Sequence, residues 1–171
     1  MRCIPPALLV LLIFSVARPI LAAVPGFRTE EIDKSLKIGY AVSLIDINGD
    51  GKLDIVVVDK ERVIWFENPS WKLRTIMEGQ KALDNVCLDP YDIDGDGKID
   101  VALGAGWRPG KTGPGDASTL QWYSRGKSLD DLWTMHSIKY DEPTLHRMRW
   151  VDLDDSGRKV LLTVPLTGRG A

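Results

Sequence analysis

The chain has 171 residues, with 22 Lys or Arg against 24 Asp or Glu, and its formal net charge is −2. Nucleic-acid binding calls for a strongly basic face, so this balance predicts no nucleic-acid partner. The two cysteines, Cys3 and Cys87, are too few to suggest a disulfide framework.

Residues 1–23 have the pattern of a secretory signal peptide. Met1-Arg2 gives a positive start, Ala7 to Val16 is apolar, and Leu21-Ala22-Ala23 offers small residues for cleavage. The apolar run has about ten residues, fewer than the ~20 that a membrane-spanning helix needs. We therefore expect export to the periplasm, the cell surface or the medium, with no stable transmembrane span after cleavage. An uncleaved anchor is the alternative. Residues 24–37 read as a lead-in.

Two nine-residue segments, 46–54 and 92–100, repeat one pattern of oxygen ligands. Each has side-chain oxygens at positions 1, 3 and 5, a Gly at position 6 for a sharp turn, and a free carbonyl at position 7. This arrangement suits Ca²⁺, a hard cation that prefers oxygen ligands. The alternative is a solvated β-turn, which the same Asp, Asn and Gly residues also favour. Because the ligands alternate and the whole register recurs, the sequence predicts structural calcium loops.

The residues after each loop argue against an EF-hand. An EF-hand needs a bidentate Glu at position 12, where this chain has Val57 and Leu103. The Asp at position 9, Asp54 or Asp100, can close the ligand ring and starts a strand-like apolar run. Each loop is thus predicted to join two strands.

The loops belong to a longer repeat of four short strands. The expected strands cover 38–45, 53–58, 62–67 and 71–76, then 85–88, 99–103, 119–123 and 133–138, and finally 145–151 and 161–165. Most of the difference between the repeat lengths is one insertion, Gly104 to Ser118. The unit has the size of a propeller blade, and a β-solenoid repeat is far shorter.

We therefore predict an all-β fold: a partial β-propeller of four-stranded blades over 38–171. Blade one covers about 38–80, blade two about 81–140, and an incomplete blade three about 141–171, or about two and a half blades. A closed propeller has about four to eight blades. The chain is thus expected to be a fragment of a larger propeller, or one completed by partners.

The loop pattern at 46–54 and 92–100, with its flanking strands, resembles the FG-GAP or VCBS repeats of integrin-α-like propellers. The stretches 65–71 and 146–150 are similar to exported bacterial members. The resemblance implies calcium held in loop one by Asp46, Asn48, Asp50, Asp54 and the Lys52 carbonyl. In loop two it implies Asp92, Asp94, Asp96, Asp100 and the Lys98 carbonyl. A third loop, with Asp152, Asp154 and Ser156, has lost two anionic ligands and is expected to bind weakly or not at all.

The expected function is a non-enzymatic binding or adhesion scaffold whose partner is an unknown extracellular protein or carbohydrate. The sequence contains no Gly-x-Ser-x-Gly elbow and no His-Glu-x-x-His motif. The alternative is a fragment of a larger secreted enzyme, polysaccharide-active or of a dehydrogenase type, with catalytic residues outside this chain. Trp107 and Arg108 in the insertion could stack on a ligand, or the insertion could be an ordinary surface loop.

Overall fold

The computed structural model describes residues 25–79 and 84–169. The predicted signal peptide, residues 1–23, lies outside the described residues. The chain divides into two units, residues 1–31 and 32–171. In the described part of the first unit, Arg28 Nη2 lies 2.8 Å from Glu30 Oε2.

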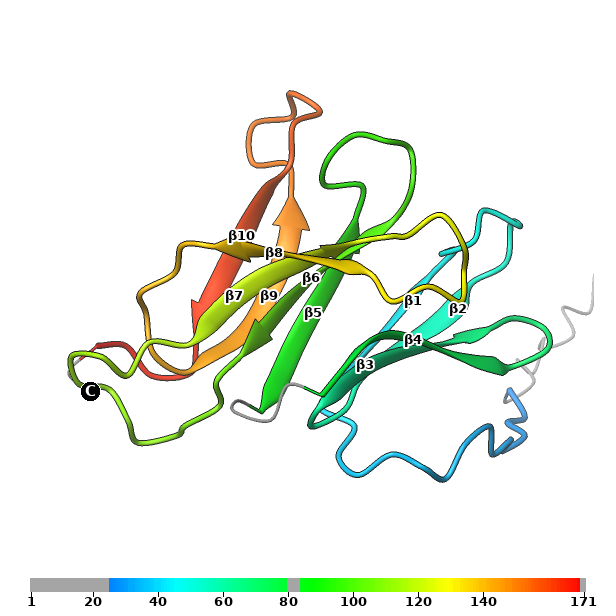
Figure 1. The fold of residues 1–171 in the computed structure, drawn as a ribbon, viewed down its shortest axis with the longest axis horizontal. Coiled ribbons are helices and arrows are strands. Elements are labelled where there is room, and N and C mark those ends of the chain that lie inside the picture. The colour runs from blue at the N-terminus through cyan, green and yellow to red at the C-terminus, as the bar shows by residue number, and fades with distance from the viewer. Residues whose placement is uncertain (1–24, 80–83, 170–171) are drawn as a thin grey trace, which may run out of the picture. The chain divides into compact units, whose positions relative to one another are not determined.

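The second unit is built from short antiparallel strands (Figure 1). Their bounds are β1 (Ala41–Ile45), β2 (Asp54–Val58), β3 (Arg62–Glu67), β4 (Lys72–Glu78), β5 (Asn85–Tyr91), β6 (Asp100–Ala105), β7 (Thr119–Ser124), β8 (Thr134–Ile138), β9 (Leu145–Val151) and β10 (Val160–Pro165). The described residues contain no α-helix, and so no helix among them that could cross a membrane. The prediction of an all-β fold is confirmed.

Within residues 25–79 and 84–169, three sheets follow one another in sequence order. The first has the strand order β1-β2-β3-β4, the second β5-β6-β7-β8, and the third consists of β9 and β10. Every neighbouring pair is antiparallel, as in a blade made of consecutive hairpins. The first two sheets are blade one and blade two, and β9 with β10 repeats the first two strands of a blade.

The hydrophobic core lies between successive blades. Side chains of β2 and β3, such as Val58 and Trp65, form one cluster with Leu103 of β6 and Tyr123 of β7. A second cluster joins blade two to β9, where Leu145 contributes its side chain. Trp65 is fully buried, and burying a large apolar side chain stabilises a fold by roughly 1.5–3 kcal/mol. Adjacent blades therefore share apolar clusters across their boundary.

The insertion begins later than the sequence predicted. Gly104 and Ala105 continue β6 and pair with Leu120 and Thr119 of β7. Gly104 permits close packing here, because a Cβ would lie 2.7 Å from Leu145 Cδ2 and 2.8 Å from Cys87 Sγ. The irregular segment is therefore residues 106–118.

Candidate cation-binding loops

All three loops share one backbone turn between the first and second strands of a blade. At positions 4 and 6 of loop one, Gly49 and Gly51 have φ angles of 80° and 84°. Loop three reproduces the turn with Asp155 at 55° and Gly157 at 82°. This left-handed conformation suits Gly and is tolerated by Asp, so the third loop keeps the turn despite its altered side chains. Figure 1 shows the three loops at corresponding ends of their sheets.

Loop two brings three carboxylates together. One oxygen each from Asp92, Asp94 and Asp100 lie within 4.8 Å of one another, and Asp100 is 1% exposed. Asp92 Oδ1 is buried and has no hydrogen-bond partner among the described residues. A buried carboxylate oxygen without a partner is costly, and a cation would satisfy it. The three residues could hold a metal ion.

The charges of the loop-two carboxylates also favour a bound cation. Burial raises the pKa of Asp100, and the nearby charge of Asp94 raises it further, while hydrogen bonds from Ile93 and Arg125 oppose the change. Carboxylates that crowd together in this way repel one another when ionised. A bound divalent cation would relieve that repulsion.

The closing carboxylates at position 9 also tie the loops to the sheets. Asp54 Oδ2 accepts a hydrogen bond from Ile47 N at 2.9 Å, and its Oδ1 accepts one from Asn68 N at 2.9 Å. Asp100 repeats both contacts, with Ile93 N at 2.9 Å and Arg125 N at 3.4 Å. Asp54 is 0% exposed. Each closing Asp thus fastens its own loop to the end of the third strand of its blade.

The position-5 carboxylates lie outside the group of three. Asp96 Oδ1 accepts Lys98 N at 2.9 Å, and its Oδ2 pairs with the Lys98 ammonium. Asp50 contacts Lys52 in the same way, at 2.9 Å and 3.3 Å. These lysine contacts lower the pKa of both carboxyl groups: the Lys98 ammonium bond leads at Asp96, and the Lys52 N–H bond leads at Asp50. The structure therefore groups positions 1, 3 and 9 of loop two without position 5.

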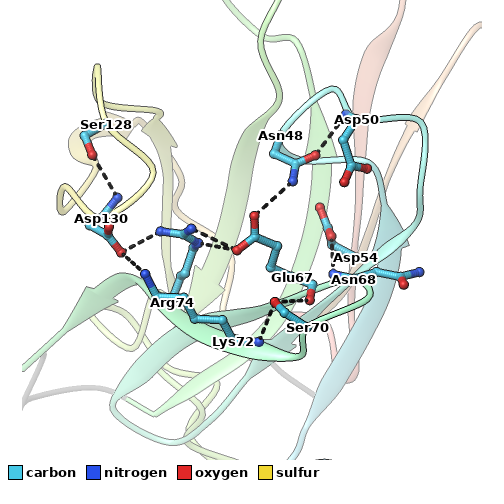
Figure 2. A network of polar contacts seen from close by, with 10 residues as sticks. All are labelled: Asn48, Asp50, Asp54, Glu67, Asn68, Ser70, Lys72, Arg74, Ser128 and Asp130. Atoms are coloured by element: carbon cyan, nitrogen blue, oxygen red, sulfur yellow. Dashed lines mark hydrogen bonds and ion pairs between the residues drawn. The ribbon is translucent and has the colours of Figure 1, made fainter.

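Loop one has an amide in place of the carboxylate at position 3. Asn48 Oδ1 accepts Asp50 N at 2.9 Å, and its Nδ2 donates to Glu67 Oε1 at 3.4 Å (Figure 2). Asp46 accepts the N–H groups of Gly49 and Gly51, both at 2.8 Å. Loop one therefore has the predicted oxygens in the predicted order, but one fewer negative charge than loop two.

In loop three the candidate ligand oxygens are bonded within the loop. Asp152 Oδ2 accepts Gly157 N at 2.7 Å, and Ser156 Oγ donates to Asp154 Oδ1 at 2.7 Å. Val160 stands at position 9 and is 38% exposed. This loop has no counterpart to the buried closing carboxylate.

The comparison with known families agrees with this geometry. Residues 46–103 match the FG-GAP-like repeat family. The chain carries an FG-GAP-like repeat. The matched segment begins at the first residue of loop one and ends in β6, so it contains both complete loops. No curated protein matches the chain.

Two arginines that support the FG-GAP-like loops were not identified from the sequence. Arg74 on β4 pairs with Glu67 Oε2 at 2.8 Å, and Glu67 in turn contacts Asn48. Arg125, which follows β7, donates from Nη1 to the carbonyl of Ile47 in loop one. Neither residue is part of the repeated ligand pattern, so only folding reveals its place beside a loop.

Residues outside the loops have packing and pairing contacts. His136 stacks on Trp122 with ring centroids 4.0 Å apart, and its Nε2 lies 2.9 Å from Ser124 Oγ. Trp107 of the insertion contacts the His146 ring in a tilted arrangement, with centroids 5.3 Å apart and an angle of 31° between the planes. Trp107 is thus engaged with a side chain of β9.

Proposed function

We propose that this chain is a calcium-binding, exported β-propeller protein whose blades serve as a binding or adhesion scaffold. The observation that supports calcium binding is the buried Asp92 Oδ1 beside Asp94 and Asp100, which has no hydrogen-bond partner in the described part of the chain. An FG-GAP-like match over both loops supports the same assignment.

Calcium fits the donors better than softer metals do. The candidate ligands are carboxylate, amide and carbonyl oxygens, whereas zinc and copper sites favour nitrogen or sulfur donors. Calcium takes about six to eight oxygen ligands, which is more than Asp92, Asp94 and Asp100 supply. Asp96 would join them by giving up the Lys98 ammonium, whose side chain is 40% exposed. The Lys98 carbonyl and solvent oxygens would complete the shell.

Calcium in these loops would stabilise the native sheets. A ligand that binds only the folded state stabilises it by mass action, by about 2.7 kcal/mol at a free concentration 100 times the dissociation constant. Extracellular calcium modules bind with dissociation constants of about 10⁻⁴ to 10⁻³ M, which suits an exported protein. The metal would have a structural role, holding the turn between the first two strands of a blade.

The main test is calcium titration of chelator-treated protein by isothermal calorimetry, together with its melting temperature with and without calcium. We expect saturable heat and a higher melting temperature with calcium. Asp92→Asn should weaken binding, whereas Asp155→Asn should not, because Asp155 occupies position 4 of the third loop and Asn also tolerates its φ of 55°. Absence of binding, or equal effects of the two substitutions, would refute the proposal.

The scaffold role and export are tested separately. Expression of the full chain and mass spectrometry of its exported form should show cleavage after residue 23; an intracellular, uncleaved product would contradict this. Carbohydrate or protein binding should depend on folded blades, so unfolding in urea should abolish it. Calcium-dependent turnover of a polysaccharide by the purified chain would favour the enzyme alternative.

A further inference from the structure

The connection between β7 and β8, residues 125–133, contacts loop one of the preceding blade. Arg125 contacts both predicted cation loops. Its main-chain N–H donates to Asp100 Oδ1, the closing carboxylate of loop two, at 3.4 Å. Its guanidinium donates from Nη1 to the carbonyl of Ile47 at position 2 of loop one. One residue thus links the closing ligand of one loop to the backbone of the other.

A second route runs from the same connection to loop one (Figure 2). Asp130 Oδ1 accepts hydrogen bonds from Arg74 Nη1 at 2.5 Å and from Lys72 Nζ at 3.1 Å. Arg74 Nε and Nη2 both donate to Glu67 Oε2, at 3.0 Å and 2.8 Å. Glu67 Oε1 then accepts the amide of Asn48 at 3.4 Å. This contact uses Nδ2 of the Asn48 amide, so it does not occupy Oδ1, the candidate ligand atom.

The middle of this second route is shielded from solvent. The side chain of Arg74 is 10% exposed and that of Glu67 is 21% exposed. The Arg74 guanidinium also lies 5.5 Å from the ring centroid of Trp65. Charge pairs that are partly buried are screened less by salt than surface pairs are. The Glu67 carboxylate that accepts the Asn48 amide is therefore held by a shielded ion pair, whereas Asp130 at the outer end of the route is 66% exposed.

Apolar and main-chain contacts fix the connection to blade one at its far end. Trp133 N donates to the carbonyl of Ile76 on β4 at 3.0 Å, and the Trp133 side chain is buried in the core between the blades. Leu129 packs against the same core. The connection is thus anchored at both ends, which favours transmission of a change at Asp100 to loop one.

We propose that the connection couples the two loops, with Arg125 as the positioning residue, so that calcium in loop two tightens calcium binding in loop one. The inference rests on the proposed calcium function. A cation held by Asp100 would fix the carboxylate that binds Arg125 N, and this would order the guanidinium on Ile47. Loop one would then lose less conformational freedom when it binds its own ion, which is positive coupling.

The corresponding residue of blade one has a different contact. Asn68 also donates its N–H to a closing carboxylate, Asp54, but its side chain returns to the Leu53 carbonyl of its own loop at 3.0 Å. The long Arg125 side chain therefore makes a contact across the blade boundary that the short Asn68 side chain does not.

The test is a thermodynamic cycle measured by calcium calorimetry. Asp46→Asn leaves loop two as the complete site, Asp92→Asn leaves loop one, and the unsubstituted chain has both. The coupling factor is the overall two-ion binding constant divided by the product of the two single-loop constants. We expect a factor of about 5 or more, in the range typical of coupled sites. In an Arg125→Met background the factor should fall well below that value, because Met keeps an apolar stem but lacks the guanidinium that donates to Ile47. The main-chain bond to Asp100 and the route through Asp130 remain in this variant.

Control variants make the result specific. Arg147→Met removes a guanidinium that contacts the adjacent His146, and the coupling factor should be unchanged. If Asp92→Asn lowers the melting temperature in chelator, Asp94→Asn replaces it as the loop-two variant. A wild-type factor of 1 or less, or a factor that Arg125→Met leaves unchanged, would overturn the coupling through Arg125 while calcium binding stands. Absence of any calcium binding would overturn both proposals.

Discussion

Asp54 should stabilise blade one even without calcium, because its carboxylate is a buried hydrogen-bond acceptor as well as a candidate ligand. The informative substitution is Asp54→Ala. It removes acceptors from the N–H groups of Ile47 and Asn68, each 2.9 Å away. Ile47 is 1% exposed, so water cannot easily replace the lost acceptor at that site.

The expected loss follows from these two contacts. A hydrogen bond to a charged group contributes roughly 1.5–3 kcal/mol, and an unsatisfied buried donor adds to the cost of losing it. Two such bonds on one carboxylate are not additive, so we expect Asp54→Ala to lower the free energy of unfolding by about 3–5 kcal/mol in chelator. Asp54→Asn retains one acceptor oxygen but turns an amide donor toward the other N–H, and should give an intermediate loss.

The assay is urea unfolding followed by tryptophan fluorescence, in chelator and in calcium. Asp50→Ala is the matched control, since Asp50 lies in the same loop and its exposed carboxylate accepts from Lys52 rather than from buried main-chain N–H groups. In chelator, Asp50→Ala should leave the unfolding midpoint nearly unchanged, and its effect should emerge in calcium. Equal losses for the two variants in chelator would refute the distinction between a structural position 9 and a solvent-facing position 5.

Three further predictions concern residues away from the loops. The pKa of Asp59 is lowered in the folded protein: burial would raise it, but N–H bonds from Ile38, Lys60 and Lys37 and the Arg62 guanidinium outweigh that effect. The ionised Asp59 carboxylate therefore stabilises the fold at pH values above its unfolded pKa, near 3.9. That contribution should disappear as pH falls through the folded pKa, and Asp59→Asn should remove this part of the stability loss in acid unfolding curves; an unchanged curve would contradict it. Burial raises the pKa of Cys87 to about 12, so in a Cys3→Ser chain the thiol should react with Ellman's reagent only after denaturation. Gly104→Ala should cost about 1–3 kcal/mol by overpacking Leu145 and Cys87, whereas Gly168→Ala, with open space around it, should be neutral in urea unfolding.

The strands could be predicted from the sequence because their apolar residues alternate and turn residues bound them. The predicted strands 62–67 and 145–151 coincide with β3 and β9. Strand ends were less accurate where the residues are ambiguous. Asp89, Pro90 and Tyr91 extend β5 beyond its apolar segment, since the strand continues pairing with β6 up to loop two.

The candidate site was only partly predictable, because ligand spacing does not say which oxygens meet. The repeat pattern predicts that Asp92, Asp94, Asp96 and Asp100 are all ligands. In the structure, Asp96 pairs with Lys98 and lies outside the cluster that the other three form. The contact between Arg125 and Ile47 joins residues 78 positions apart. No local pattern marks such a pair, because it depends on how blade two packs against blade one.

The two loops differ in charge in a way that sets the order in which they fill, whereas the coupling between them is reciprocal. Blade one has Asn48 at position 3 of its loop, and Glu67 is the last residue of β3. Blade two has Asp94 at position 3, and Ser124, the last residue of β7, stands where blade one has Glu67. Glu67 supplies a carboxylate next to loop one, but Arg74 largely neutralises it. Loop two therefore has more uncompensated negative charge among its candidate ligands, and calcium affinity rises with ligand charge. Loop two should fill first, so that Arg125 is ordered before loop one binds its ion.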